Sequence, residues 1–246
     1  MVRFLPSLPT TLLAAGALLL TGCAGLSGEA PRSSSNESRS EQVASTAPLL
    51  PSQLFPGEAD QFEAWRCSSE QDLVTAFGER EMRLWSAHGA YRLPPAVVAS
   101  GARYQRGDLS FWSKGGEATV ESANGRLECN AAMARTSLTR EQRPGVMFHG
   151  RGNEPGWHVN LAHDVPELTL VLDYGMREMT LPYRVTVMDN AHGRVALVSA
   201  APQQPFELHL EARACFDDMS GEPFPARVTL NVEGNTYRGC GQGIAP

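Results

Sequence analysis

Residues 109–130 read LSFWSKGGEATVESANGRLECN, with two glycine-containing turns separating three short β-like runs. The runs are Leu109–Ser113, Ala118–Ser122 and Arg126–Asn130. The second turn contains Asn124-Gly125, which is a strong hairpin signal because both residues tolerate the positive φ of tight hairpins. This stretch therefore predicts consecutive antiparallel strands.

The same spacing of short runs continues along most of the chain, and no long segment has the 3.6-residue period of a helix. Before this stretch we expect strands at Phe62–Cys67, Leu73–Phe77, Glu81–Ser86, Ala90–Leu93 and Ala102–Gln105. After it we expect strands at Val146–His149, Trp157–Leu161, Leu168–Tyr174, Glu178–Pro182, Arg184–Met188, Val195–Ala200, Phe206–Ala214, Ala226–Val232 and Thr236–Gly239. The prediction is an all-β protein, with a small antiparallel β-barrel of about eight strands followed by a second antiparallel β domain.

The N-terminal residues 1–22 predict a lipoprotein signal peptide. The apolar run from Leu12 to Leu20 is too short to span a bilayer, which needs about 20 apolar residues. Leu20-Thr-Gly-Cys23 resembles a bacterial lipobox, which implies cleavage before Cys23 and diacylglyceryl and acyl chains on it. Several chains on one residue anchor a protein stably in a membrane. Ala24, in place of Asp, suggests the periplasm-facing outer membrane.

The rest of the chain divides by composition into a tether and two domains. Residues 23–59 are rich in Ser, Pro, Ala and Gly and predict a flexible tether behind the lipid. Residues 60–134 are expected to form the first domain, and the polar stretch 135–144 a linker. Residues 145–246 then form the second domain.

Four cysteines remain if Cys23 is lipidated, and an even number in an exported chain predicts disulfides. Three pairings are open. The domain boundary falls in the longest gap, which favours pairing Cys67 with Cys129 and Cys215 with Cys240. The cysteine spacings are not those of a zinc site, and the histidines are scattered, so we expect no metal or other cofactor.

The balance of 21 Lys+Arg against 27 Asp+Glu gives a formal net charge of −6. Without a basic stripe, the composition argues against nucleic acid as a partner. An acidic surface instead favours encounters with basic proteins. The sequence leaves a homodimer open.

Lys114 is the only lysine of the chain, and it stands between an aromatic pair and Gly115-Gly116. A lysine ammonium is a compact charge on a thin stem, whereas arginine is a planar fork. The position could thus need a slim cation for a narrow gap. A charge beside a turn is also commonly just solvated, so the spacing alone does not decide.

Two motifs and two cysteines of the first domain together resemble the MliC/PliC family of C-type lysozyme inhibitors. They are Ser100-Gly-Ala-Arg-Tyr104, the segment Phe111–Ala118, Cys67 and Cys129, and the resemblance covers about residues 60–132. The resemblance implies a small, disulfide-stapled β-barrel in the bacterial envelope, with C-type lysozyme as its partner and no enzymatic activity.

The resemblance also implies that Ser100 and Lys114 enter the lysozyme cleft, with Gly101, Tyr104 and Gly115 in support. C-type lysozyme works with a protonated and an ionised carboxyl group. An ammonium between them would pair with the ionised group, and such charge-assisted hydrogen bonds are strong. A serine hydroxyl can donate or accept, which suits a carboxyl of either protonation state.

The second domain contains FHGRGNEPGW at residues 148–157 and CFDDMSGEPFP at residues 215–225. These motifs resemble an envelope domain of uncharacterised function, over about residues 145–243, in which Gly156 and Phe224 replace the commoner Phe and Tyr. Glu154 and Asp217 could form the carboxylate pair of a glycan hydrolase. We favour a role in orienting turns, because nothing in the sequence brings the two together.

The sequence therefore leaves three hypotheses. The leading one is a lipid-anchored inhibitor of C-type lysozyme that protects peptidoglycan. The second is a structural or ligand-binding envelope lipoprotein in which the inhibitor-like barrel is only a scaffold. The third is a cell-wall hydrolase that uses the second domain.

Overall fold

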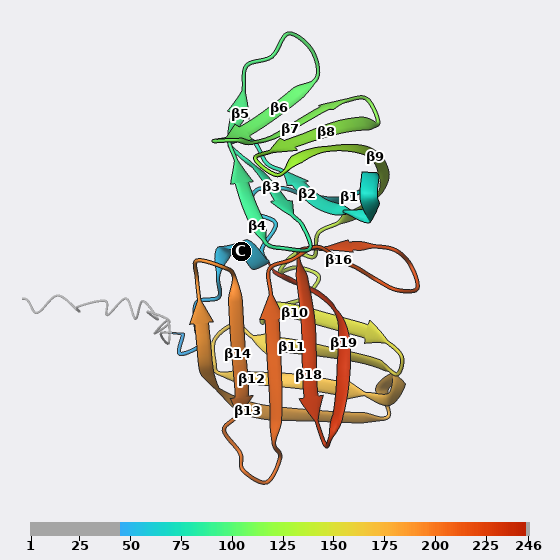
Figure 1. The fold of residues 1–246 in the computed structure, drawn as a ribbon. Helices are drawn as coiled ribbons and strands as arrows, with labels where there is room; N and C mark the ends of the chain where they lie inside the picture. The colour runs from blue at the N-terminus through green and yellow to red at the C-terminus, as the bar shows by residue number, and fades with distance from the viewer. Residues whose placement is uncertain (1–44, 245–246) are drawn as a thin grey trace, which may run out of the picture. The chain divides into compact units, whose positions relative to one another are not determined.

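The computed structural model describes residues 45–244 and is built from antiparallel strands with three short 3-10 turns (Figure 1). The all-β prediction is confirmed. None of the described residues form a helix with the length and apolar character needed to cross a bilayer. The predicted signal peptide, Cys23 and the first part of the predicted tether lie outside the described residues.

The first half of the chain forms a nine-stranded sheet in the order β4-β3-β2-β1-β9-β8-β7-β6-β5. Its strands are β1 (Gln61–Cys67), β2 (Leu73–Phe77), β3 (Met82–Trp85), β4 (Ala90–Leu93), β5 (Pro95–Ala96), β6 (Ala102–Arg106), β7 (Leu109–Lys114), β8 (Glu117–Ser122) and β9 (Gly125–Thr136). No ladder joins the end strands β4 and β5, although Gln105 N donates to Pro94 O beside them at 3.0 Å. The core of this sheet includes Trp65, Leu84 and Phe111, all almost fully buried.

Three features of this sheet differ from the prediction. A small barrel of about eight strands was predicted here, whereas nine strands form a sheet without a ladder between its end strands. The hairpin between β8 and β9 turns at Ala123 and Asn124, one residue earlier than expected, and Gly125 begins β9 with φ +128°. β9 continues to Thr136, because beyond its pairing with β8 it stays paired with β1 as far as Gln61. The start of the predicted 135–144 linker is therefore part of a strand.

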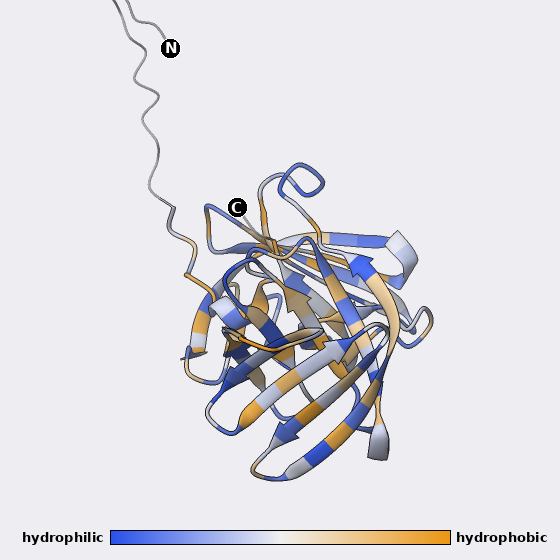
Figure 2. Cartoon of the chain, turned by 90° about the horizontal axis from the view of Figure 1, so that it is seen from above, coloured by the Kyte–Doolittle hydropathy of each residue, from blue (hydrophilic) through white to orange (hydrophobic). Residues whose placement is uncertain are grey.

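The second half closes into an eight-stranded barrel in the order β10-β11-β12-β13-β14-β15-β18-β19 (Figure 1). Its strands are β10 (Val146–Asn153), β11 (Gly156–Ala162), β12 (Glu167–Leu172), β13 (Arg177–Asp189), β14 (Arg194–Ser199), β15 (Phe206–Glu211), β18 (Ala226–Val232) and β19 (Asn235–Gly243). Burial alternates along β11, β15 and β18, as expected when side chains point in turn into a barrel and out of it. Figure 2 shows bands of hydrophobic (orange) and hydrophilic (blue) residues alternating along strands of the molecule.

β13 replaces the two strands that were predicted at Glu178–Pro182 and Arg184–Met188. Pro182 is the last residue that pairs with β12, and Tyr183 is the first that pairs with β14. A proline lacks the N–H that a ladder needs. At this changeover between two partners the missing donor is tolerated, so the strand continues.

The segment before the first sheet, which was predicted as part of a flexible tether, is packed from residue 45 onward. Leu54 is fully buried, within the 3-10 turn η1 (Ser52–Leu54). Trp85 Nε1 donates to Gln53 O at 2.8 Å, and Gln53 Nε2 donates to Asn190 O at 2.8 Å. The composition hid this role because it depends on Leu54, which is buried in a cluster with residues that are distant in the sequence.

The two disulfides of the described residues are Cys67–Cys129 and Cys215–Cys240, the pairs predicted from the sequence. Cys67 and Cys129 lie directly opposite each other on β1 and β9, the central strands of the first sheet. Cys215 begins the short strand β16 (Cys215–Phe216), which pairs with β17 (Pro223–Phe224) outside the barrel ladder. Its bond to Cys240 ties this pair to β19.

Candidate functional site

Lys114 is the last residue of β7, and it pairs with Glu117 across the turn to β8. Gly115 in this turn has φ +64°, a conformation that glycine adopts without steric cost. The Lys114 side chain is exposed. Among residues 45–244 no carboxylate forms an ion pair with it. The hairpin therefore presents an ammonium that is free to take a partner.

Ser100 lies in the loop between β5 and β6, which runs directly against the Lys114 hairpin. Ala102 pairs with Ser113, so the residues just before β6 reach the level of Lys114. A Cβ atom placed on Gly101 would lie 2.3 Å from Ser113 O and 3.3 Å from Lys114 Cβ. The structure thus brings the two predicted motifs together at one exposed edge.

Two features hold the Ser100 loop in this position. Trp112 Nε1 donates a hydrogen bond to Ser100 O at 3.0 Å from the neighbouring strand. Gly101 has φ +74°, and no other residue would fit against Ser113 O at such close range. A loop fixed before binding loses little conformational freedom when a partner arrives.

The aromatic residues of these motifs divide into core and edge. Phe111 is fully buried, and Tyr104 packs on Phe77 with 5.5 Å between ring centroids. Tyr104 therefore supports the sheet beneath the edge. Trp112 remains partly exposed and positions the Ser100 carbonyl, a role that the sequence did not suggest.

The structure adds an apolar rim to the edge that sequence reasoning missed. Val97 is completely exposed and Val98 is 37% exposed, in the loop that leads to Ser100. The available signal was the unbroken run Ala96-Val97-Val98-Ala99, which has no strand alternation and was assigned to no element. These two valines add exposed apolar surface to the loop that contains Ser100.

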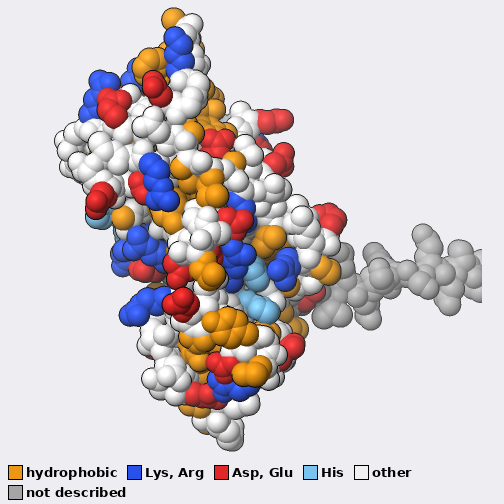
Figure 3. Space-filling view, turned by 90° about the vertical axis from the view of Figure 1, so that its right-hand side faces the viewer, with side chains coloured by type: hydrophobic (Ala, Val, Ile, Leu, Met, Phe, Trp, Pro, Cys, Tyr) orange, Lys and Arg blue, Asp and Glu red, His pale blue; other side chains and the backbone are white. Residues whose placement is uncertain are grey.

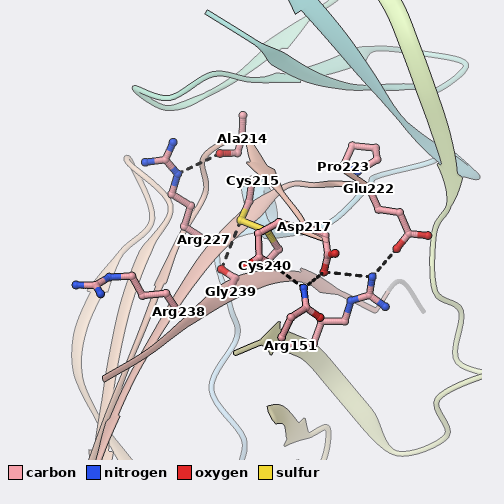
Figure 4. Close-up of a disulfide and its surroundings, with 12 residues drawn as sticks. Arg151, Ala214, Cys215, Asp217, Glu222, Pro223, Arg227, Arg238, Gly239 and Cys240 are labelled. Carbon is pink, nitrogen blue, oxygen red and sulfur yellow. Dashed lines mark hydrogen bonds and ion pairs between the residues drawn. A yellow bond between two sulfur atoms is a disulfide. The ribbon is translucent and has the colours of Figure 1, made fainter. Parts of the chain in front are cut away.

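The motifs of the second domain meet around Asp217, which is almost fully buried (Figure 4). Its carboxylate accepts hydrogen bonds from Ser220 N at 2.8 Å, Ser220 Oγ at 2.9 Å and Asn153 Nδ2 at 3.0 Å. It also lies 3.5 Å from Arg151 Nη2, which pairs with Glu222 as well. Burial alone would raise the pKa of Asp217, but the hydrogen bonds from Ser220 and Asn153 and the Arg151 charge outweigh it and lower the pKa.

This network orients a turn and leaves Asp217 fully occupied. Glu154, the other carboxylate of the hydrolase hypothesis, is exposed beside Asn153. A retaining or inverting glycosidase needs both of its carboxyl groups facing a sugar. The contacts of Asp217 favour the turn-orienting interpretation instead. Within the described part of the chain no group of three or more His, Cys, Asp or Glu side chains could hold a metal ion.

Comparison with known proteins gives one family match. Residues 65–128, about a quarter of the chain, match the family described as membrane-bound lysozyme-inhibitor of c-type lysozyme. This segment contains Ser100, Lys114 and most of the first sheet. No curated protein matches the chain. The match therefore bears on the first sheet alone.

Proposed function

We propose, from this family match and the geometry of its segment, that the protein is a membrane-anchored inhibitor of C-type lysozyme. The observation that supports the proposal is the close approach of Gly101 to Ser113 O and Lys114 Cβ, since the Ser100 loop then lies against the Lys114 hairpin. The family match gives the class of partner, and this edge is the part of the sheet that could enter a cleft. The inhibitor acts by occlusion and catalyses no reaction.

The chemistry of the edge suits a cleft that contains two carboxyl groups. The Lys114 ammonium pairs with the ionised carboxylate and occupies the place of the sugar. The Ser100 hydroxyl donates to or accepts from either carboxyl. Val97 and Val98 then cover the contact, and excluding water strengthens the charge pair.

The lipobox-like segment Leu20-Thr-Gly-Cys23 supports a position in the cell envelope. A lipid on Cys23 would hold the protein at the periplasmic face of the outer membrane. Lysozyme that crosses the outer membrane would meet the inhibitor before it reaches peptidoglycan. An acidic chain also attracts basic proteins at long range.

A cell-wall lysis assay with C-type lysozyme tests the proposal on the full chain, purified in detergent. The parent should inhibit lysis, and Lys114→Ala and Ser100→Ala should each weaken inhibition. For Lys114 the expected loss is at least about 30-fold, since central interface residues are worth about 2 kcal/mol or more. Lys114→Arg should also lose potency, because the guanidinium fork is broader than the ammonium.

Arg106→Ala is the matched control, because Arg106 is exposed at the opposite end of β6. It should inhibit like the parent. Absence of inhibition by the parent would refute the function. Inhibition that survives both Lys114→Ala and Ser100→Ala would keep the function and refute the site.

A further inference from the structure

A second candidate site lies on the barrel, where a cavity of about 400 Å³ opens on the outer face of β10 and β11. This volume is within the usual range of small-molecule sites, about 300–1,000 Å³. Six of the residues that line the cavity have charged, imidazole or aromatic side chains: Arg143, His149, Arg151, Trp157, His158 and Tyr174. Figure 3 shows pale-blue histidines beside blue and orange side chains on one face of the molecule.

The cavity is positively charged, and Arg143 is the main reason. Arg151 is already paired with Glu222 and Asp217. Arg143 makes no ion pair among residues 45–244. Burial is the main cause that lowers the pKa of His158. The Arg143 charge lowers this pKa further, and the charge of Glu178 opposes both effects. No Asp or Glu side chain lines the cavity.

His149 supplies a hydrogen-bond acceptor beside this charge. Burial of the ring lowers the pKa of His149 to about 4. The Asn160 hydrogen bond acts in the opposite direction, and the Arg143 charge adds to the lowering. The ring is therefore neutral at neutral pH. Its Nδ1 lies 2.8 Å from Asn160 Oδ1, an atom that can only accept. Nδ1 is therefore the donor, and Nε2 is left as an acceptor for a hydroxyl group.

Tyr174 forms one wall of the cavity in a strained conformation. Asp173 and Tyr174 have φ of +52° and +58°, which non-glycine residues seldom adopt and which cost about 1–3 kcal/mol each. Tyr174 Oη donates to Asn153 O at 3.2 Å, and the ring covers Gly156, where a Cβ atom would lie 2.6 Å from Tyr174 Cδ1. Even so, 76% of the Tyr174 surface stays exposed. A strained, exposed ring beside a charged cavity is a feature of a binding site rather than of a core.

From these features we infer that the cavity binds one sugar unit that bears a carboxylate. Arg143 pairs with the carboxylate, His149 Nε2 accepts a hydrogen bond from a sugar hydroxyl, and the Tyr174 ring packs on the apolar face of the pyranose. The cavity has room for one such unit. The inference does not depend on lysozyme inhibition, since its residues lie outside the segment that matches the inhibitor family.

Isothermal titration calorimetry on the full chain, in detergent and without lysozyme, tests this inference. The probes are N-acetylmuramic acid and glucuronic acid, with N-acetylglucosamine and glucose as their uncharged counterparts and inorganic phosphate as a free anion. We expect saturable binding of at least one acidic sugar, with a dissociation constant on the order of 1 mM or below. The uncharged sugars and phosphate should bind at least about tenfold more weakly, because each lacks one of the two required features.

Two variants and a control assign the binding to the cavity. Arg143→Gln should weaken binding of the acidic sugar at least about tenfold. Tyr174→Gly should also weaken it while leaving the protein folded, because glycine adopts the positive φ without strain. Arg184→Gln, at an exposed position on β13, should bind like the parent.

Three results would overturn the inference. One is the absence of saturable binding by both acidic sugars. Another is equal binding of the uncharged sugars or of phosphate. The last is unchanged binding by both Arg143→Gln and Tyr174→Gly.

Discussion

Lys114 and Ser100 show how much of a site depends on single residues that fix a backbone. The ammonium needs no partner within the described chain to hold its place, because the Gly115 turn sets the end of β7. Ser100 is positioned through its carbonyl, which accepts the Trp112 hydrogen bond, and the residue is exposed. The fold fixes where Lys114 and Ser100 lie. The chemistry of the proposed site is that of an ordinary lysine ammonium and an ordinary serine hydroxyl.

His149 gives a pH dependence that can be measured. Its pKa falls from an ordinary value of about 6.5 to about 4 because the ring is buried. Between pH 6.5 and pH 4 the unfolded chain binds a proton at this residue and the folded chain does not. The free energy of unfolding is therefore unaffected by His149 above about pH 6.5 and falls as the pH falls toward 4. The loss amounts to roughly 3 kcal/mol at most. His158, whose pKa is also lowered by burial and Arg143, acts in the same direction.

Urea unfolding at pH 7 and near pH 4.5 should therefore show a smaller loss of stability for His149→Gln than for the parent. His88→Gln, at an exposed position, is the control and should behave like the parent. Equal losses in His149→Gln and the parent would contradict the assignment of this pH dependence to His149.

Among the elements, the β7–β8 hairpin and the loop before β6 act as one unit, and Gly101 is where they touch. Gly101→Ala would require a positive φ of an alanine and would place a Cβ atom 2.3 Å from Ser113 O. The loop must then move away, with a stability cost of about 1–3 kcal/mol. Inhibition of lysozyme should fall although Ser100 and Lys114 are both still present. Gly107→Ala, also at a positive φ but with open space around it, is the control and should inhibit like the parent.

The strands themselves could be predicted from sequence to within a few residues, because alternation and turn residues are local signals. The hairpin at Asn124-Gly125 is one example, where only the position of the turn differed. The continuation of β9 to Thr136 could not be predicted, since it depends on pairing with β1, far away in sequence. The contact between Gly101 and Lys114 arose in the same way, from strand register that no local pattern encodes.

At the scale of the whole molecule, residues 45–244 contain two hydrophobic clusters, and one of them extends from the first sheet into the barrel. Leu54, Phe62 and Trp85 are buried in the same cluster as the barrel interior. Arg135 lies between two rings, 5.0 Å from the centroid of Phe62 and 3.9 Å from that of Phe224. Its Nε donates to Pro223 O at 2.9 Å. These contacts join β1 and β9 to the β16–β17 pair.

Leu54 tests whether the segment before the first sheet contributes to this core. Leu54→Ala should lower the free energy of unfolding by about 2–5 kcal/mol, as for other fully buried leucines. Leu49→Ala is a matched control in the same segment, because Leu49 is 90% exposed. It should change stability by less than about 0.5 kcal/mol. Equal effects of the two substitutions in urea unfolding would mean that the segment does not pack as described.

The central claim is that the Lys114 ammonium pairs with the ionised catalytic carboxylate of lysozyme. A double-mutant cycle measures this pairing directly. It combines Lys114→Ala with replacement of the ionised carboxylate of lysozyme, which is an aspartate, by asparagine, and it determines the affinity of all four combinations. A direct contact predicts a coupling energy of about 1.5 kcal/mol or more, because close charge pairs across interfaces reach such values. A coupling energy near zero, with both single replacements still weakening the complex, would show that Lys114 acts elsewhere on the enzyme.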